Sequence, residues 1–203
     1  MSKISDNMKQ LSYGLYAVLT MDGDRPTGCI MNTVFQISND PVTVAIGINK
    51  NNYTADVIRS SGRFSVSILS EQSPRKVITD LGFRSGRDCN KLEELSYSMV
   101  DGLPVLNEQI SGAFTCQVES VADAGTHYLI LAKVSEAVEA SELRPMTYRY
   151  YHENVKNAPV GDGNSVKYVC DICGYVHEGD INDEPDDYRC PMCGVLKSYF
   201  KKA

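Results

Sequence analysis

The sequence predicts a mainly β protein with short helices, followed by a small metal-binding unit near its C-terminal end. Segments of apolar and β-branched residues, separated by turn residues, recur between residues 14 and 138, and this pattern is typical of short strands. A stretch rich in Asn, Gly and Pro follows at residues 154–166 and indicates an exposed connection. Two CxxC pairs then lie within residues 166–203, a segment too short for a hydrophobic core of its own.

The first strands are expected early in the chain. Gly14–Met21 is apolar and β-prone, DGDRP is a turn, and Thr27–Ser38 is expected as one strand that completes a hairpin. Asn39, Asp40 and Pro41 break the chain. A short buried strand is then expected at Val42–Ile48.

The later elements mix helix and strand. Helical spacing predicts Tyr53–Ser61, and a Ser-Pro start predicts a helix at Ser73–Leu81. Phe64–Leu69 alternates as a strand, while Ala113–Val121 and Tyr128–Val138 are long strands that flank the turn ADAGTH. Because strands dominate, a barrel is favoured over a doubly wound sheet. The sequence has no GxGxxG or Walker motif, so any dinucleotide would bind without a Rossmann fingerprint.

Composition limits the partners and the compartment. The net charge of −6 and pI near 5.1 argue against binding to nucleic acid or acidic lipid. The sequence has neither a signal-peptide pattern nor a membrane-length apolar run, so we expect a cytoplasmic protein without a membrane partner. The odd number of cysteines, with Cys29, Cys89 and Cys116 scattered along the chain, fits a reducing compartment.

These features divide the chain into a first unit at residues 1–156, a linker at residues 157–165 and a metal-binding unit at residues 166–203. The last unit is too short to fold on apolar burial alone. The metal must therefore supply folding free energy, and its loss is expected to unfold the unit.

The metal ligands are predicted to be Cys170 and Cys173 in CDICG, and Cys190 and Cys193 in CPMCG. Two residues between paired cysteines let one tight turn direct both sulfurs at a single ion. The glycine after each pair can take a positive φ and bring N–H groups near the sulfurs. A tetrahedral site of four thiolates holds zinc or iron. Zinc has no redox chemistry, whereas a single iron held in this way carries one electron.

Several segments resemble known families. TGCIMNTVFQISNDPVTVAIGINKNNYTADVI, FRSGRDCNK, GTHYLILAKV and MTYRYYHENVK resemble, in this order, the flavin reductase family of FMN-binding split barrels, over roughly residues 8–156. YVCDICGY, PDDYRCPMCG and SYF resemble rubredoxin. Together they resemble the high-molecular-weight rubredoxins. This implies an FMN-binding split β-barrel fused to a rubredoxin-like domain, and a homodimer with FMN near the subunit interface.

The resemblance implies an FMN site made of three groups of residues. One group lines the flavin ring and its polar edge. Another surrounds the phosphate at the N-terminus of the helix near Tyr53, where free N–H groups favour anions. The third closes the site from a loop. In that order the groups are Asn32, Thr33, Val34 and Gln36; Asn49, Lys50, Tyr53 and Thr54; and Ser85, Gly86 and Arg87. From the residues alone, Thr33 also fits a plain strand residue, and NKNN a solvated turn.

His127 is the candidate catalytic residue, because it corresponds to a histidine common at this place in flavin reductases, where the resemblance implies a role beside flavin or nicotinamide. The alternative is a polar turn residue hydrogen-bonded to the backbone. The signals at His152 and His177 are weaker, and His177 is expected to be solvated since four sulfurs already satisfy the metal. Cys29 is expected to be a packed apolar residue.

Cysteine spacing alone fits a zinc ribbon as well as rubredoxin, and the surrounding residues favour iron. Tyr168, Tyr175, Tyr188 and Phe200 stand around both pairs as in rubredoxin, where such aromatics exclude water from the iron–sulfur bonds. Pro191 matches the second rubredoxin turn. The connection between the pairs is shorter than in ordinary rubredoxins, and tyrosine stands where many have tryptophan.

We therefore expect an NAD(P)H-dependent flavin/rubredoxin oxidoreductase. Electrons would pass from NAD(P)H through FMN to the iron, and then to a partner such as a flavodiiron protein that reduces oxygen or nitric oxide. The acidic run at residues 180–187 is either a solvated turn or a docking surface for a basic partner. Two alternatives stay open: a flavin-binding protein whose zinc ribbon only mediates contacts, and a flavin reductase that releases reduced FMN. The sequence does not identify the nicotinamide site, the choice of NADH, NADPH or a separate reductase as donor, or the terminal acceptor.

Overall fold

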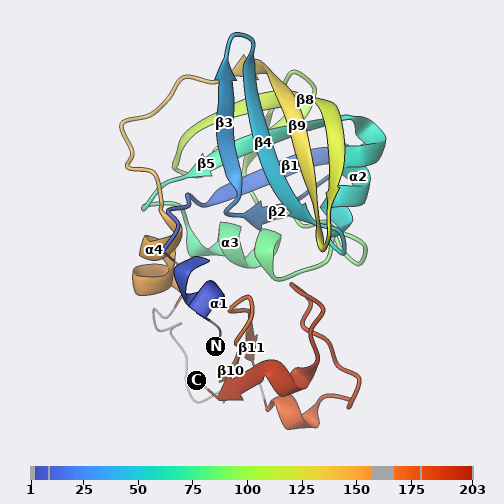
Figure 1. Cartoon of the computed structure of the whole chain (residues 1–203). Helices are drawn as coiled ribbons and strands as arrows, with labels where there is room; N and C mark the ends of the chain where they lie inside the picture. Colours follow the sequence, from blue (N-terminus) through green and yellow to red (C-terminus); the bar gives the residue numbers. More distant parts are fainter. Residues whose placement is uncertain (1–2, 9, 157–166, 179, 203) are drawn as a thin grey trace.

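The structure is a computed structural model that describes residues 3–8, 10–156, 167–178 and 180–202. A larger β unit lies above a small C-terminal unit in the view of Figure 1, with helix α3 between them. The mainly β class expected from the sequence is confirmed. The linker expected at residues 157–165 lies outside the described residues.

Seven antiparallel strands form the main sheet in the order β2-β1-β5-β8-β9-β4-β3. The strands are β1 Tyr16–Asp22, β2 Arg25–Met31, β3 Val34–Asn39, β4 Val42–Asn49, β5 Arg63–Leu69, β8 Ile110–Ala124 and β9 His127–Ala137. A separate hairpin pairs β6 Tyr97–Val100 with β7 Leu103–Leu106. The sheet curls so strongly that its two edge strands approach each other (Figure 1).

The described helices are short. They are α1 Lys3–Met8, α2 Tyr53–Ser61, α3 Arg75–Gly82 and α4 Tyr148–Tyr150, with a π-helix at Tyr151–Val155 that continues α4. Helix α2 has the bounds that the sequence predicts. Asn52 caps its N-terminus by accepting a hydrogen bond from the Thr54 N–H, and Gly62 ends it in the left-handed conformation at φ 70°.

The expectation that Thr27–Ser38 is one strand is wrong. The chain leaves the sheet at Asn32 and Thr33, between β2 and β3. Strand β2 pairs with β1 and β3 pairs with β4, so the two halves belong to opposite edges of the sheet. The flanking residues are β-prone on both sides of the break, and only these long-range pairings reveal it.

The turn ADAGTH is shorter than expected. Strand β8 continues through Ala124 and β9 begins at His127, so only Gly125 and Thr126 make the turn. Gly125 has φ 76°, which a residue without a Cβ adopts at little cost. The backbone of Thr126 accepts a hydrogen bond from the Lys50 N–H at 3.1 Å, which brings His127 beside the end of β4.

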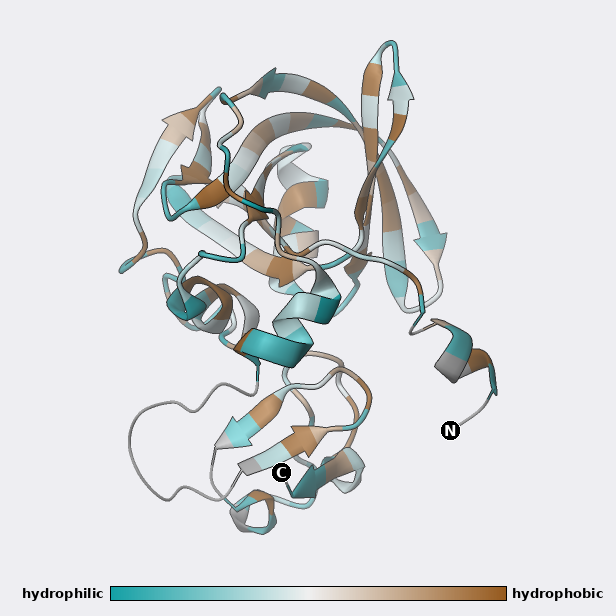
Figure 2. Ribbon diagram, turned by 90° about the vertical axis from the view of Figure 1, so that its left-hand side faces the viewer, coloured by the Kyte–Doolittle hydropathy of each residue, from teal (hydrophilic) through white to brown (hydrophobic). Residues whose placement is uncertain are grey.

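Two clusters of apolar side chains fill the larger unit. One lies inside the curled sheet around Phe64, Ile46 and Ile130, and the other lies between the sheet and α3 around Leu19 and Leu81. Figure 2 shows apolar and polar residues alternating along several strands, as the two-residue repeat of a half-buried strand requires. Within the described part of the chain, no helix is long and apolar enough to cross a membrane.

The C-terminal unit is a three-stranded sheet in the order β11-β10-β12. Its elements are β10 Lys167–Cys170, β11 Val176–Glu178 and β12 Phe200–Lys202, with short 3-10 turns at Ile181–Asp183 and Lys197–Tyr199. Tyr168, Tyr175 and Tyr188 pack against a buried group that contains Phe200 and two cysteines. The small aromatic core expected from the sequence is therefore present.

The expectation that His177 is solvated is wrong. His177 is 8% exposed and its ring lies edge-on against Tyr188 and Phe200. Its Nδ1 is 3.4 Å from the Tyr188 hydroxyl, and its Nε2 is 3.6 Å from a Glu184 carboxylate oxygen. The imidazole contributes apolar surface to a unit that has little of it, and this explains its burial.

Candidate metal centre and adjoining cleft

Cys170, Cys173, Cys190 and Cys193 place their sulfur atoms within 4.8 Å of one another. The Cys170 and Cys193 sulfurs are 3.7 Å apart, and those of Cys173 and Cys190 are 3.4 Å apart. Metal–sulfur bonds of about 2.3 Å give a tetrahedron with sulfur–sulfur edges of about 3.8 Å. The four thiols therefore fit one tetrahedral metal ion.

The two cysteine turns are built alike. The N–H of Gly174 donates to the Cys170 carbonyl, and that of Gly194 donates to the Cys190 carbonyl, both at 2.8 Å. The two glycines have φ values of 75° and 74°, a conformation that L side chains rarely adopt. The neighbouring Cys173 side chain and backbone N–H groups lower the pKa of Cys190 to about 5 despite burial. The hydrogen bond with Cys190 and burial raise the pKa of Cys173, and burial raises that of Cys193 to about 11, so a metal ion must displace protons from these thiols when it binds.

The four ligands differ in exposure. Cys170 and Cys190 are 1% and 2% exposed, whereas Cys173 and Cys193 are only partly buried. Cys173 and Cys193 also line a cleft of about 340 Å³ that separates the metal-binding unit from the larger unit. A metal in this site would therefore have its more accessible side directed at the cleft.

The cleft is bounded by segments that are far apart in the sequence. Its walls come from the β2–β3 break, the end of β4, the end of α3, the α4 segment and both cysteine turns. The larger unit provides Cys29, Ile30, Met31, Asn32, Thr33, Gly47, Asn49, Asn52, Phe83, His127, Tyr148 and Tyr151, among others. This volume and this mixture of apolar and amide groups are typical of a pocket for a flat organic cofactor.

Direct contacts hold the metal-binding unit over this cleft. The rings of Phe83 and Tyr175 meet edge-on with centroids 5.6 Å apart. A Cβ on Gly194 would lie 3.4 Å from Nδ2 of Asn51. A Cβ on Gly174 would collide with the ammonium group of Lys156. Both cysteine turns therefore approach the larger unit closely.

Besides the two cysteines, the structure brings four of the predicted flavin-site and catalytic residues into the cleft, namely Asn32, Thr33, Asn49 and His127. Thr33 donates to the Asn32 amide oxygen at 3.0 Å. The Asn49 amide oxygen accepts from the Asn51 N–H at 2.9 Å. Nδ1 of His127 is 2.8 Å from the Thr126 hydroxyl, so the alternative expectation of a backbone bond is replaced by a side-chain one.

The other predicted residues of the ring and phosphate groups lie elsewhere. Val34 belongs to the core, and the exposed Gln36 amide is bonded to Ser38 and Asn39. Lys50 forms an ion pair with Asp123 at 2.6 Å. Thr54 is buried.

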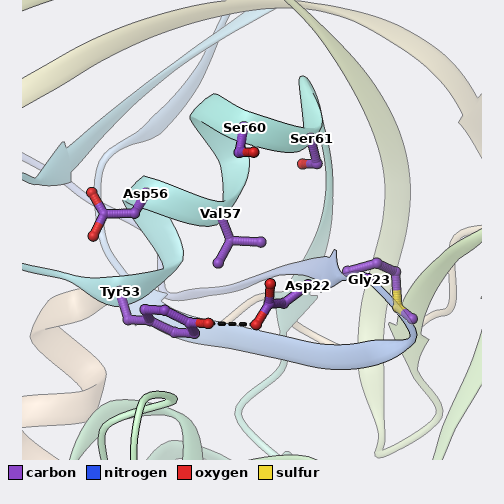
Figure 3. Close-up of a pocket in the computed structure, with 8 residues that line it drawn as sticks. Asp22, Gly23, Tyr53, Asp56, Val57, Ser60 and Ser61 are labelled. Atoms are coloured by element: carbon purple, nitrogen blue, oxygen red, sulfur yellow. Dashed lines mark hydrogen bonds between the residues drawn. The ribbon is translucent and has the colours of Figure 1, made fainter.

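Tyr53 faces a second pocket of about 330 Å³, between α2 and the β1–β2 turn (Figure 3). Its hydroxyl donates to the carboxylate of Asp22, as the dashed line in Figure 3 marks. Arg25 bonds the same two groups. The Tyr53 hydroxyl is thus already engaged at this second pocket, and Tyr53 is not among the residues that line the first cleft.

The loop that contains Ser85, Gly86 and Arg87 reaches the same helix. Arg87 pairs with Asp56 at 2.8 Å and its guanidinium lies 5.1 Å from the Tyr53 ring centroid. A Cβ on Gly86 would lie 2.9 Å from Cδ1 of Tyr53. This close approach explains why a glycine stands at that position.

The sequence interpretation missed several residues of the cleft. Asn52 was identifiable as a helix cap, because an Asn directly precedes the helical pattern. Tyr148 and Tyr151 stand in an aromatic-rich segment, and burial raises the pKa of Tyr151 to about 12, so its hydroxyl stays protonated at neutral pH. Cys29 is 2% exposed and burial raises its pKa, which confirms it as a packed residue.

Two family models match the chain. Residues 8–159 match the family described as flavin reductase like domain. Residues 168–201 match the family described as rubrerythrin, rubredoxin-like domain. A flavin, either FMN or FAD, and one iron ion are the cofactors that these two domains bind.

Individual proteins are similar over much of the chain. A high molecular weight rubredoxin from Moorella thermoacetica is 36% identical, with 95% of this chain and 96% of that protein covered. A ferric-chelate reductase (NAD(P)H) from Archaeoglobus fulgidus is 33% identical over 70% of this chain and 85% of its own. A solved structure, nitrilotriacetate monooxygenase component B from Mycobacterium thermoresistibile, has a TM-score of 0.64 at 21% identity, with 93% and 95% of the two chains covered. The last likeness concerns the fold alone.

Proposed function

The chain belongs to the flavin reductase like domain family and ends in a rubredoxin-like domain, and on this premise we propose that it passes electrons from NAD(P)H through FMN to one iron. The proposed iron ligands are Cys170, Cys173, Cys190 and Cys193. When bound, FMN exchanges electrons in pairs or singly, and a single iron held by four thiolates accepts one at a time.

One observation carries the proposal. The two partly exposed cysteines, Cys173 and Cys193, line the same cleft as Asn32, Thr33 and His127. The site that would hold the flavin and the accessible side of the metal centre therefore adjoin within one chain. A metal that served only to stabilise the fold would not require this placement.

The roles of the cleft residues follow from their chemistry. Asn32 and Thr33 offer amide and hydroxyl groups at the break between two strands, where they can bond the polar edge of a ring. Asn49 and Asn52 lie at the N-terminus of α2, where free N–H groups favour a phosphate. The proposal also keeps the rest of the predicted set, in which Arg87 lies beside that helix. These residues are Val34, Gln36, Lys50, Tyr53, Thr54, Ser85, Gly86 and Arg87.

We place the two functional units at residues 1–156 and 166–203, joined by residues 157–165. The matched ranges, residues 8–159 and 168–201, support a division in this part of the chain. A flavodiiron oxygen or nitric oxide reductase is the proposed acceptor, and a diflavin flavoprotein among the relatives supports this class of partner.

An absorption spectrum of the protein purified without added metal tests the proposal. We expect flavin bands together with ferric–thiolate bands, and both should bleach when NAD(P)H is added under anaerobic conditions. Zinc in place of iron would contradict the proposal. Iron bands that stay oxidised while the flavin is reduced would contradict transfer within the chain, and a flavin that stays oxidised would exclude NAD(P)H as the direct donor.

We also propose a homodimer that forms through the outer face of β3, β4 and β9. Phe35, Ala45 and Leu131 stand opposite one another across these three strands; Phe35 is 52% exposed, Leu131 is half-buried, and Ala45 is buried between them. Leu129, which follows along the same face, is 37% exposed. An exposed apolar strip of this kind marks an association surface.

Replacing Phe35 by lysine is expected to convert the dimer to a monomer, because a charge would be buried at the interface without a partner. Sedimentation should then give 22.4 kDa instead of twice that mass. Met99→Lys is the matched control, since Met99 is also 52% exposed but lies on the β6–β7 hairpin. Equal masses for the parent and Phe35→Lys would contradict this interface.

A further inference from the structure

Lys156 stands where the larger unit meets the first cysteine turn. It directly follows the π-helix Tyr151–Val155, and its N–H donates to the Tyr151 carbonyl at 2.8 Å. The Arg75 guanidinium donates to the Lys156 carbonyl at 3.3 Å. The backbone of Lys156 is therefore held by two bonds to the larger unit, while its side chain extends the other way.

The side chain of Lys156 reaches the metal-binding unit. Its ammonium group lies against the backbone of Gly174, so closely that a Cβ there would collide with it. Gly174 directly follows Cys173, and the space for Lys156 exists because this position has no side chain. His152 borders the same spot, with Cε1 3.6 Å from where that Cβ would stand.

The cysteine cluster acts electrostatically on this ammonium group. Burial lowers the pKa of Lys156, while the charges of Cys173 and Cys170 raise it. Two carboxylates of the metal-binding unit bond elsewhere, in the pairs Lys201–Asp171 and Lys197–Asp186. Across the described ranges, no carboxylate pairs with Lys156.

We propose that Lys156 is a positioning residue that holds the first cysteine turn against the cleft and favours the reduced state of the iron. This inference rests on the proposed function, because it takes iron as the metal. Four thiolates leave the centre at −1 with ferric and −2 with ferrous iron. A fixed positive charge beside the turn therefore attracts the reduced centre more strongly and raises its reduction potential.

The same charge couples the redox state to the contact between the two units. If contact with Lys156 favours reduction, then reduction must strengthen that contact by the same factor, because binding linkages are reciprocal. The contact of Phe83 with Tyr175 across the cleft is uncharged. It does not change with the charge of the metal centre.

The test is the midpoint potential of the iron in the full chain, measured by spectroelectrochemistry with mediators and without NAD(P)H. Lys156→Gln is expected to lower the ratio of ferrous to ferric iron at a fixed potential about tenfold, a downward shift of about 59 mV for one electron. Lys156→Arg keeps the charge and is expected to stay near the parent value. Added salt should bring the parent toward Lys156→Gln, because ions screen the attraction.

Lys133→Gln is the matched control. It removes the same charge from an exposed position of β9, opposite Thr43. Thr43 lies on β4, the strand that ends with Asn49 at the cleft. A potential unchanged in Lys156→Gln, or an equal shift in Lys133→Gln, would overturn the inference. A shifted potential in a protein whose iron NAD(P)H does not reduce would support the role of Lys156 and reject the electron route of the proposed function. A chain that binds no iron would overturn both.

Discussion

Replacing Cys190 by serine is expected to abolish iron binding and to unfold residues 167–202, while the seven-stranded sheet stays folded. Cys190 is one of only four buried apolar residues described in the small unit, with Cys170, Ile181 and Phe200. Such a core cannot offset the conformational entropy of the segment. A structural site of four thiolates contributes on the order of 10 kcal/mol to folding, and the loss of one ligand removes most of it.

Three measurements check this expectation in one sample. Metal analysis should find no bound iron, the ferric–thiolate bands should be absent, and proteolysis should cut the C-terminal unit first. Cys89→Ser is the control, since Cys89 lies outside the cluster and its thiol bonds only the Ser85 carbonyl among the described residues. A folded, protease-resistant C-terminal unit in Cys190→Ser would show that aromatic packing suffices without the metal.

The metal centre was predictable because its information is local. Each CxxC turn orients its own two sulfurs through bonds within a few residues, such as Gly174 N–H to the Cys170 carbonyl. Only one long-range step, the meeting of two similar turns, then completes the cluster. The aromatic residues beside the cysteines were predictable for the same reason.

The cleft was predictable only in part, because it is assembled by long-range pairing. The break at Asn32 and Thr33 exists since β2 and β3 lie at opposite edges of the curled sheet, and no property of Thr27–Ser38 itself contains that information. The resemblance pointed to Asn32 and Thr33, but it gave no sign that Val34, the next residue, belongs to the core. Tyr53 likewise faces Asp22 through a hydrogen bond that joins segments far apart in the chain.

The placement of the two units relative to each other had no sequence signal. It depends on pairs such as Phe83 with Tyr175 and Lys156 with Gly174, each made of a common residue type in an ordinary context. The prediction that His177 is solvated was wrong for a related reason. The assumption that a histidine without a ligand role is solvated ignores how few apolar groups a small unit has.

Gly47→Val is expected to weaken flavin binding at least about tenfold while the protein stays folded. Gly47 lies on β4 and lines the cleft, and a Cβ at this position would stand 3.1 Å from the Thr33 methyl group. The two branches of valine must then displace Thr33 or occupy the cleft. Overpacking of this kind costs roughly 1–3 kcal/mol, and each 1.4 kcal/mol taken from binding is about tenfold in affinity.

A control variant separates an effect on the cleft from a general effect on the sheet. The Gly47 N–H bonds the Thr33 carbonyl, and valine preserves this backbone bond, so the β-branched residue suits the strand. Gly112→Ala is the control, because a Cβ on that glycine of β8 would find its nearest neighbours at an ordinary 3.8 Å. In flavin titrations, the affinity should fall from the parent to Gly47→Ala and further to Gly47→Val. Gly112→Ala should bind flavin as tightly as the parent. Unchanged affinity in Gly47→Val, with iron content and unfolding temperature also unchanged, would place the flavin elsewhere and remove the structural reason for transfer to Cys173 and Cys193.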